Sequence, residues 1–354
     1  MSDDNLFRYA GLSHGGNVLA MAKKYQRPAE QWLDLSTGLN PKGWSVPAVP
    51  EHIWQALPQE EDELQNAACE YYGCEYCLPV AGSQAAIKTL PELRNRSKVG
   101  IVSPTYAEHE NAWVKAGHHV SQIKLNNIEN ELAALDVLVV INPNNPTGDM
   151  IATATLLSWH QQLSKKGGWL IVDEAFMDVT PQHSLLSKGI LPGLIVLRSL
   201  GKFFGLAGLR CGFVITHEDL LQRLADKIGP WTVTGPTRYV AIRALKDKTW
   251  QSYTRDRLLV EGEKLSQLLN TYGLKTTGTA LFQWTTHAES KTIFEIFAQQ
   301  GILLRYFEES VIMERSLRFG LPENESQWQR LTTALILLEN KLNINESKEL
   351  PEHE

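Results

Sequence analysis

Residues 194–212 of the chain read LIVLRSLGKFFGLAGLRCG, an apolar run followed by a glycine-rich segment that holds one lysine. The run at 194–197 predicts a buried strand, and Lys202 follows shortly after its end. A lysine in such a position often extends to solvent, and nearby glycines often only mark turns. The question is therefore what else the sequence places at the ends of its strands.

Other apolar runs end in the same way. Residues 99–102, 137–141 and 169–172 are short and apolar, and each is followed by a polar turn and a helical pattern. This alternation predicts an α/β fold with a mostly parallel sheet and helices on both faces. Because ligands bind beyond the carboxyl ends of such strands, we expect the functional site there.

The C-terminal third has a different pattern. A long charged helical stretch is expected from Thr237 to about Tyr272, followed by short strands and a last helix near 325–341. This indicates a smaller α/β domain joined through the long helix. Residues 343–354 are polar and acidic, so we expect a frayed tail.

The composition narrows the function classes. The chain has 354 residues, a net charge of −6 and 43% hydrophobic residues, which fits a globular protein and disfavours nucleic acid or an anionic membrane as partner. No apolar run is long enough to span a bilayer, and the acidic start of the chain lacks the layout of a signal peptide. Four cysteines form no disulfide framework, so the cytoplasm is the simplest expectation.

The spacing of the cysteines gives little indication of a metal or redox site. Cys74 and Cys77 have C-x-x-C spacing, but no second pair completes a zinc site, so no metal is expected. A redox role for this pair is the weaker alternative. Cys69 and Cys211 are predicted to be small core residues.

The polar residues that follow the strands are individually ambiguous. Gly82, Ser83 and Gln84 begin a helix, where free backbone N–H groups favour a phosphate, although an ordinary N-cap is the more common role for Ser83. Asn145 lies in a rigid turn that extends its amide outward, or serves the turn alone. Asp173 ends a strand, where a carboxylate is costly unless it has a cationic partner or caps a helix.

Taken together, these residues suit one ligand. The spacing Ser199-x-x-Lys202 also occurs in serine acyl-transfer enzymes, but the other elements of that site are missing, and no G-x-G-x-x-G follows a strand. Pyridoxal phosphate needs a lysine, a carboxylate at its ring nitrogen, a partner for its ring oxygen, an aromatic face and a phosphate cup with an arginine. In that order the candidates are Lys202, Asp173, Asn145, Tyr106 and a cup of Gly82, Ser83, Gln84, Ser199 and Arg210.

The motifs NPNNPTG at 142–148, VDEAF at 172–176 and SLGKFFGLAGLRCG at 199–212 resemble the fold-type I pyridoxal-phosphate enzymes of the histidinol-phosphate aminotransferase branch, with their aspartate-aminotransferase-like fold. The resemblance covers nearly the whole chain. HGGN at 14–17 and LDLSTGLNP at 33–41 are similar to the threonine-phosphate decarboxylases of the cobalamin pathway. The resemblance implies a homodimer with sites at its interface, and a chain divided into an N-terminal segment at 1–45, a large cofactor domain at 46–245, a small domain at 246–342 and a tail at 343–354.

The resemblance also implies a role for each cofactor residue. Lys202 would form the Schiff base with pyridoxal phosphate, and Asp173 would keep the pyridine nitrogen protonated. Asn145 would hold the ring oxygen, Tyr106 would cover one ring face, and the cup residues would bind the phosphate through charge-assisted hydrogen bonds.

Further residues are implied on the substrate side. Arg318 matches the arginine that holds the substrate carboxylate, a bidentate task that suits a guanidinium, whereas a surface salt bridge is the usual role of a strand arginine. Arg305 falls where relatives hold a substrate phosphate. His14, from the same or the partner subunit, and Gly38 are expected in the substrate pocket.

Two positions depart from the aminotransferases. Phe176 stands where many carry a tyrosine that assists at the ring oxygen, and Leu57 lies about where a tyrosine reaches the partner subunit's cofactor phosphate. Both departures disfavour an aminotransferase.

The resemblance therefore implies decarboxylation of L-threonine O-3-phosphate to (R)-1-aminopropan-2-ol phosphate in cobalamin biosynthesis. The alternatives are an aminotransferase for a phosphorylated or aromatic amino donor, and a non-catalytic scaffold, which the complete set of cofactor residues disfavours. Decarboxylation and transamination differ in which Cα bond stands perpendicular to the ring, and the sequence leaves that orientation open.

Overall fold

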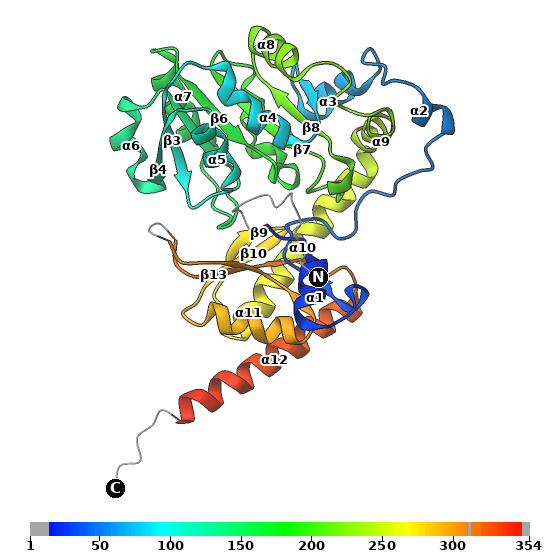
Figure 1. The fold of residues 1–354 in the computed structure, drawn as a ribbon, viewed down its shortest axis with the longest axis vertical. Coiled ribbons are helices and arrows are strands. Elements are labelled where there is room, and N and C mark those ends of the chain that lie inside the picture. Colours follow the sequence, from blue (N-terminus) through cyan, green and yellow to red (C-terminus); the bar gives the residue numbers. More distant parts are fainter. Residues whose placement is uncertain (1–13, 311–312, 349–354) are drawn as a thin grey trace, which may run out of the picture.

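The computed structural model describes residues 14–310 and 313–348 of the chain. The strands of its larger part are β2 (Leu78–Val80), β3 (Lys98–Ser103), β4 (His119–Lys124), β5 (Val137–Ile141), β6 (Trp169–Asp173), β7 (Leu194–Ser199) and β8 (Gly212–Ile215). Within the described ranges they form one seven-stranded sheet in the order β2-β8-β7-β6-β5-β3-β4 (Figure 1). The strands from β4 to β7 are parallel, whereas β8 is antiparallel to both β7 and β2. The predicted, mostly parallel sheet is confirmed.

Helices cover both faces of this sheet (Figure 1). One face packs against α4 (Ser83–Thr89), α5 (Glu108–Lys115) and α8 (Glu218–Ile228). The other packs against α3 (Leu64–Tyr72), α6 (Ile128–Glu131), α7 (Thr153–Ser164) and α9 (Gly235–Lys246). In β5, Val137 and Val139 join the first core, and Leu138 and Val140 join the second. Successive strand residues point to opposite faces, so a strand that is buried on both faces must be apolar throughout.

The smaller part is an antiparallel sheet that packs against three helices. Its strands are β9 (Thr277–Thr279), β10 (Phe282–Thr286), β12 (Arg305–Phe307) and β13 (Ser316–Gly320), in the order β12-β13-β10-β9. The helices are α10 (Lys248–Thr271), α11 (Ser290–Gln299) and α12 (Glu325–Lys348). Their apolar faces continue the core on the second face of the large sheet, so the two parts share buried contacts.

Two helix predictions need correction. The single helix expected from Thr237 to Tyr272 is divided into α9 and α10, because the Asp247 side chain caps the second helix by accepting from the backbone N–H of Trp250 at 3.0 Å. The last helix continues to Lys348, beyond its expected end and into the predicted tail. Residues 349–354 of that tail, like residues 1–13 of the predicted N-terminal segment, lie outside the described residues.

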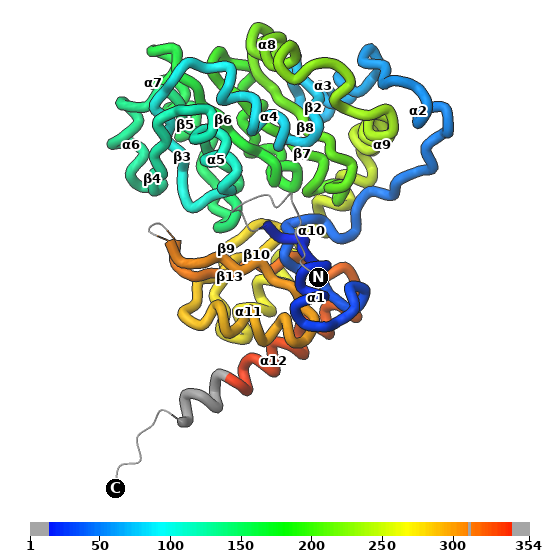
Figure 2. Tube along the Cα trace, in the orientation of Figure 1, coloured from blue at the N-terminus to red at the C-terminus, as the bar shows by residue number. Residues whose placement is uncertain are grey.

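The N-terminal segment connects the two parts. After α1 (Val18–Tyr25), β1 (Leu33–Asp34) pairs in parallel with β11 (Ile302–Leu303) of the smaller part. Figure 2 traces the chain from there along the edge of the molecule to α2 (Glu51–Gln55) beside the large sheet. Residues 14–40 are thereby held at the boundary between the two parts. Across the described chain, no helix combines the length and the hydropathy that a membrane crossing requires.

Candidate active site

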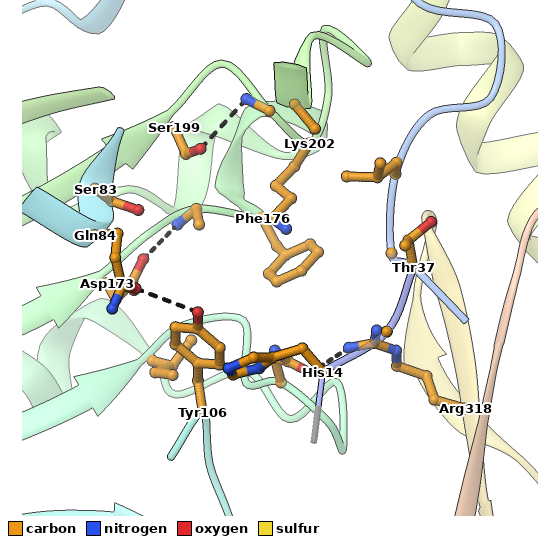
Figure 3. A pocket seen from close by; sticks show the side chains of 18 of the residues that line it. His14, Thr37, Ser83, Gln84, Tyr106, Asp173, Phe176, Ser199, Lys202 and Arg318 are labelled. Atoms are coloured by element: carbon orange, nitrogen blue, oxygen red, sulfur yellow. Dashed lines mark hydrogen bonds between the residues drawn. The ribbon is translucent and has the colours of Figure 1, made fainter. Parts of the chain in front are cut away.

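The residues that follow β5, β6 and β7 converge on one cavity between the two parts. Lys202 lies just beyond β7, Asp173 is the last residue of β6, and Asn145 follows β5. They line a cavity of about 270 Å³, the site shown in Figure 3. The other predicted residues that line it are His14, Gly38, Ser83, Gln84, Tyr106, Ser199, Arg210 and Arg318. Of the residues predicted for the site, Gly82 and Arg305 do not line this cavity.

Lys202 points into the cavity toward the ring of Phe176 (Figure 3). Its Nζ lies 5.3 Å from the centroid of that buried ring. Burial, with the positive charge of Arg318 nearby, lowers the pKa of Lys202 to about 8, against the opposing influence of Asp173. A sizeable fraction of this amine is therefore neutral near physiological pH, as a nucleophile or proton acceptor must be.

Asp173 is buried and oriented by two donors. The backbone N–H of Ala175 donates to Oδ1 at 3.0 Å, and Nε2 of the buried His109 lies 3.0 Å from Oδ2. The edge of the Tyr106 ring meets the His109 ring, with centroids 6.4 Å apart. His109 was not predicted, because its position on α5 (Glu108–Lys115) gives no sign in the sequence that it faces the end of β6.

A cup of donors surrounds the start of α4. Gly82 has φ +72°, and a Cβ there would lie 2.7 Å from Nη2 of Arg210, so this backbone conformation and close approach require glycine. The N-cap position is Gly82, not Ser83, and the ordinary N-cap interpretation of Ser83 is wrong. Ser83, Ser199 and Arg210 instead line the cavity, and two hydroxyls with one guanidinium suit a phosphate.

Arg318 crosses from the small sheet to the cofactor residues. Its Nη1 donates to Oδ1 of Asn145, and its Nη2 donates to the Ser36 carbonyl at 2.7 Å. Its buried Nε has no partner within the described residues. Burial, together with nearby Arg305, lowers the pKa of Arg318 to about 9. The alternative of a surface salt bridge is therefore wrong.

Arg305 lines a second cavity next to the first. It lies directly opposite Arg318 in the register of β12 and β13, so both side chains leave the same face of the sheet. The second cavity has a volume of about 420 Å³ and shares His14 and Gly15 with the first. Burial lowers the pKa of Arg305 as well. Two opposed arginines on one face make a site suited to an anion.

His14 is joined to the cofactor side by a chain of hydrogen bonds. Its Nε2 lies 3.1 Å from Oε1 of Glu108, and Gln84 Nε2 donates to the other oxygen of Glu108 at 2.7 Å. Tyr106 then donates to Gln84 Oε1 at 3.2 Å. Burial, with the charge of Glu108, raises the pKa of Tyr106 to about 12, so its phenol stays neutral. Glu108 was not predicted, and its spacing in the sequence carried no specific signal.

Two other predicted positions are explained by packing. A Cβ on Gly38 would lie 2.9 Å from Phe282 and 3.0 Å from Phe176, so this segment approaches both rings because it lacks a side chain. Phe176 has no hydroxyl that could contact a ligand in the cavity. Its ring packs edge-on against the ring of Phe282, with the ring centroids 5.1 Å apart. Leu57 is 61% exposed and does not line the cavity.

A buried ion cluster of Arg198, Glu174 and Asp178 lies behind the cofactor residues. Arg198 Nη1 donates to Glu174 at 2.6 Å, and its Nη2 donates to Asp178 at 2.5 Å. Glu174 follows Asp173, and Arg198 precedes Ser199, so the cluster ties together the ends of β6 and β7. The sequence analysis did not predict it.

The comparisons with known proteins agree with this geometry. The chain matches the family described as aminotransferase class I and II over residues 31–335. It is 51% identical to the threonine-phosphate decarboxylase of Pseudomonas aeruginosa, over 92% of this chain and 97% of the relative. It is 37% identical to the threonine-phosphate decarboxylase of Sinorhizobium sp, over 93% of this chain and 99% of the relative.

A solved structure shows the same fold. The histidinol-phosphate aminotransferase of Sinorhizobium meliloti, in complex with pyridoxal-5'-phosphate, matches with a TM-score of 0.78 at 18% identity, over 95% of this chain and 100% of that one. At this identity the match concerns the fold alone, and it confirms the predicted fold class. The chain belongs to the aminotransferase class I and II family.

Proposed function

We propose that this protein is a pyridoxal-phosphate-dependent decarboxylase that converts L-threonine O-3-phosphate to (R)-1-aminopropan-2-ol phosphate and CO2. The observation that carries this function is the identity of 51% to a threonine-phosphate decarboxylase over 92% of the chain. The geometry agrees, since a cavity with cofactor-binding groups adjoins a second one lined by an arginine.

The donor set of the first cavity fits pyridoxal phosphate. Arg210, Ser83 and Ser199 supply a cation and two hydroxyls for its phosphate, beside a glycine that leaves room for the guanidinium. Asp173, oriented by His109, supplies the carboxylate for the pyridine nitrogen. When bound, the cofactor withdraws electrons from the substrate Cα and thereby weakens the bonds to that carbon.

Asn145 and Tyr106 complete the cofactor site. Because Oδ1 of Asn145 accepts from Arg318, its Nδ2 group is the one that can donate to the ring oxygen. The neutral phenol of Tyr106 is held by Gln84, which fixes its ring at the cavity wall. With phenylalanine at position 176, Asn145 is the main partner of the ring oxygen.

Lys202 would hold the cofactor covalently, and its amine is placed to move a proton. Loss of CO2 leaves Cα in need of a proton, and the Lys202 ammonium can deliver it. A pKa of about 8 allows this amine to gain and lose the proton near neutral pH. Its position beside the apolar ring of Phe176 keeps water from competing for that transfer.

The substrate side binds two anions. Arg318, whose two Nη groups are fixed by Asn145 and Ser36, lines the cavity and receives the substrate carboxylate. Arg305 and His14 line the adjoining cavity and bind the substrate phosphate. Gly38 lines the same cavity and, because it lacks a side chain, lets the N-terminal segment approach the rings of Phe176 and Phe282.

The test is incubation of the loaded protein with L-threonine O-3-phosphate while CO2 and aminopropanol phosphate are measured. We expect both products in equal amounts without any added 2-oxo acid. Turnover that requires 2-oxoglutarate would contradict the proposal and establish the aminotransferase alternative. The alternative has weaker support, since two relatives that match nearly the whole chain at 51% and 37% identity are named decarboxylases.

We propose further that the protein acts as a homodimer in the cytoplasm, within cobalamin biosynthesis. Support for a dimer comes from large apolar side chains that are exposed near α2 and α9, where Trp54 is 66% and Trp231 53% exposed. Light scattering of the wild type and of Trp54→Glu tests the dimer. A monomeric wild type at micromolar concentration would contradict it.

A further inference from the structure

Three cysteines meet where the chain reverses between α3 and β2. Cys69 lies in the last turn of α3, and Cys77 directly precedes β2. Gly73 has φ +67° and ends the helix, so the chain turns back and brings Cys74 to the same place. The Sγ atoms of Cys69 and Cys77 are 3.6 Å apart.

The thiols differ in exposure and acidity. Cys69 and Cys74 are partly exposed, whereas Cys77 is 1% exposed. Hydrogen bonding among the three thiols lowers the pKa of Cys69 to about 3 and raises the pKa of Cys77. Cys69 is therefore the most acidic thiol of the cluster, and it is partly exposed to solvent.

Cys211 is a useful contrast within the same chain. It is buried, and burial raises its pKa to about 12, which is typical of an inert core cysteine. The prediction of a core residue is confirmed for Cys211, whereas Cys69 is only partly buried and packs against the edge of the core. The difference arises because Cys69 faces two other thiols at the surface end of a helix.

The cluster is arranged for thiol chemistry rather than for metal binding. Among the described residues no group of His, Cys, Asp and Glu side chains is placed to hold a metal ion. Two sulfurs at 3.6 Å need to approach by about 1.5 Å to reach the disulfide length of ~2.05 Å. In the segment from 70 to 76 that joins them, Tyr72 is buried and the other six residues are exposed or partly exposed, so the stretch from Gly73 to Tyr76 has room to adjust.

We propose that Cys69 and Cys77 form an oxidation site for a hydroperoxide, in which the Cys69 sulfur attacks the peroxide and is oxidised first, and Cys77 then resolves the oxidised Cys69. This inference does not rest on the proposed decarboxylation.

The chemistry balances with hydrogen peroxide as the oxidant. The Cys69 thiolate attacks one peroxide oxygen, the O–O bond breaks, and hydroxide leaves as water after taking a proton, so the sulfur becomes a sulfenic acid. The Cys77 sulfur then attacks the Cys69 sulfur, the S–O bond breaks, and the second water leaves with the Cys77 proton. Overall, two thiols lose two electrons and two protons, and one peroxide becomes two waters.

The test uses glutamyl endopeptidase, because Glu70 and Glu75 separate the three cysteines. The loaded protein is treated with equimolar hydrogen peroxide, free thiols are blocked with N-ethylmaleimide, and the digest is examined by mass spectrometry. We expect fragment 64–70 joined to fragment 76–92, two hydrogens lighter than their sum. Oxidation of Cys69 should be at least about tenfold faster than that of Cys211.

Variants sharpen this result. Cys77→Ala should remove the linked fragments and leave a sulfenic acid on Cys69 that dimedone captures, while Cys211→Ser should give the wild-type pattern. A link that includes fragment 71–75, or oxidation of Cys69 no faster than that of Cys211, would overturn the proposal. The identity of the linked fragments and the relative oxidation rates of Cys69 and Cys211 are both measured on the wild-type protein, so neither depends on how the variants fold.

Discussion

The two sides of the active site are built in different ways. The cofactor side consists of strand ends of one parallel sheet, and its residues Asn145, Asp173 and Lys202 follow three neighbouring strands. The substrate side joins parts far apart in the sequence, since His14 precedes α1 while Arg305 and Arg318 lie on β12 and β13. Sheet topology thus positions the residues that perform the chemistry. Contacts between the N-terminal segment and the small sheet position the residues that select the substrate.

The two sides also differ in how they are supported. Behind the cofactor side, the buried ion cluster of Arg198, Glu174 and Asp178 ties β6 to β7. On the substrate side, His14 is held by Glu108 near the surface, with the His14 side chain 48% exposed. A buried charge network loses much when one partner is removed, whereas an exposed pair contributes little to stability. His14 can therefore be altered with less effect on the fold than the members of the buried cluster.

Replacing Lys202 should have the largest effect and tests the cofactor side alone. Lys202→Ala removes both the covalent attachment and the proton donor, so we expect turnover to fall by at least about 10³-fold. The visible absorbance that the cofactor gains on covalent attachment should also disappear. Lys88→Ala on the exposed side of α4 is the matched control. Full activity of Lys202→Ala would disprove the assignment of this lysine.

Arg318 connects the two sides, and its replacement should have the next largest effect. Arg318→Lys keeps the charge but loses the planar fork that contacts Asn145, Ser36 and the substrate carboxylate. We expect kcat/KM to fall by roughly 100-fold, as for loss of one or two charge-assisted hydrogen bonds. Steady-state kinetics of this variant and of Arg315→Lys, an exposed neighbour, measure the effect. Equal values for the two variants would remove Arg318 from the site.

The cofactor side was largely predictable from the sequence for a physical reason. Parallel strands bring their carboxyl ends to one edge, so residues that follow each apolar run must meet there. Asn145, Asp173 and Lys202 could be placed together without any knowledge of side-chain geometry. The buried pair of Asp173 with His109 was not predicted, because a histidine on a helix gives no sign of which strand it faces.

The substrate side could be placed only through the family resemblance. Arg305 and Arg318 face each other because of the register of β12 and β13, which the short strands of that region do not specify. The pairing of β1 with β11, which brings the N-terminal segment to the small sheet, is equally non-local. The proximity of Cys69 to Cys77 was not predicted either, because it depends on the reversal of the chain after α3. The C-x-x-C spacing indicated only the pair of Cys74 and Cys77.

Changes at Arg305 and His14 should separate substrate selection from chemistry. Arg305→Gln and His14→Gln each remove a phosphate partner, so kcat/KM for threonine phosphate should fall by about tenfold or more. The same variants should change the slow reaction of unphosphorylated L-threonine by less than about threefold, since that substrate makes no phosphate contact. Steady-state kinetics on both substrates give, for each variant, the ratio of kcat/KM for threonine phosphate to kcat/KM for L-threonine. An equal loss on both would place these residues in the chemistry instead.

The smallest expected effect is an electrostatic coupling between the two sides. Arg318 contributes to the low pKa of Lys202, so removing its charge in Arg318→Met should raise that pKa from about 8 toward the ordinary value of 10.5. Burial is the larger cause and persists, which limits the rise to about one unit. Below the pKa the amine is protonated and unreactive, so the midpoint of Lys202 acylation in the cofactor-free protein should move to higher pH.

Competitive labelling with acetic anhydride across a pH series, read by mass spectrometry of the peptide that holds Lys202, measures this midpoint. Arg315→Met removes an exposed charge that does not contribute to the low pKa of Lys202, so its midpoint should match the wild type. If Arg318→Met also matches the wild type, the two sides are electrostatically independent, and burial alone accounts for the acidity of Lys202. A shift confined to Arg318→Met means that the residue that receives the substrate carboxylate also tunes the amine that moves the proton.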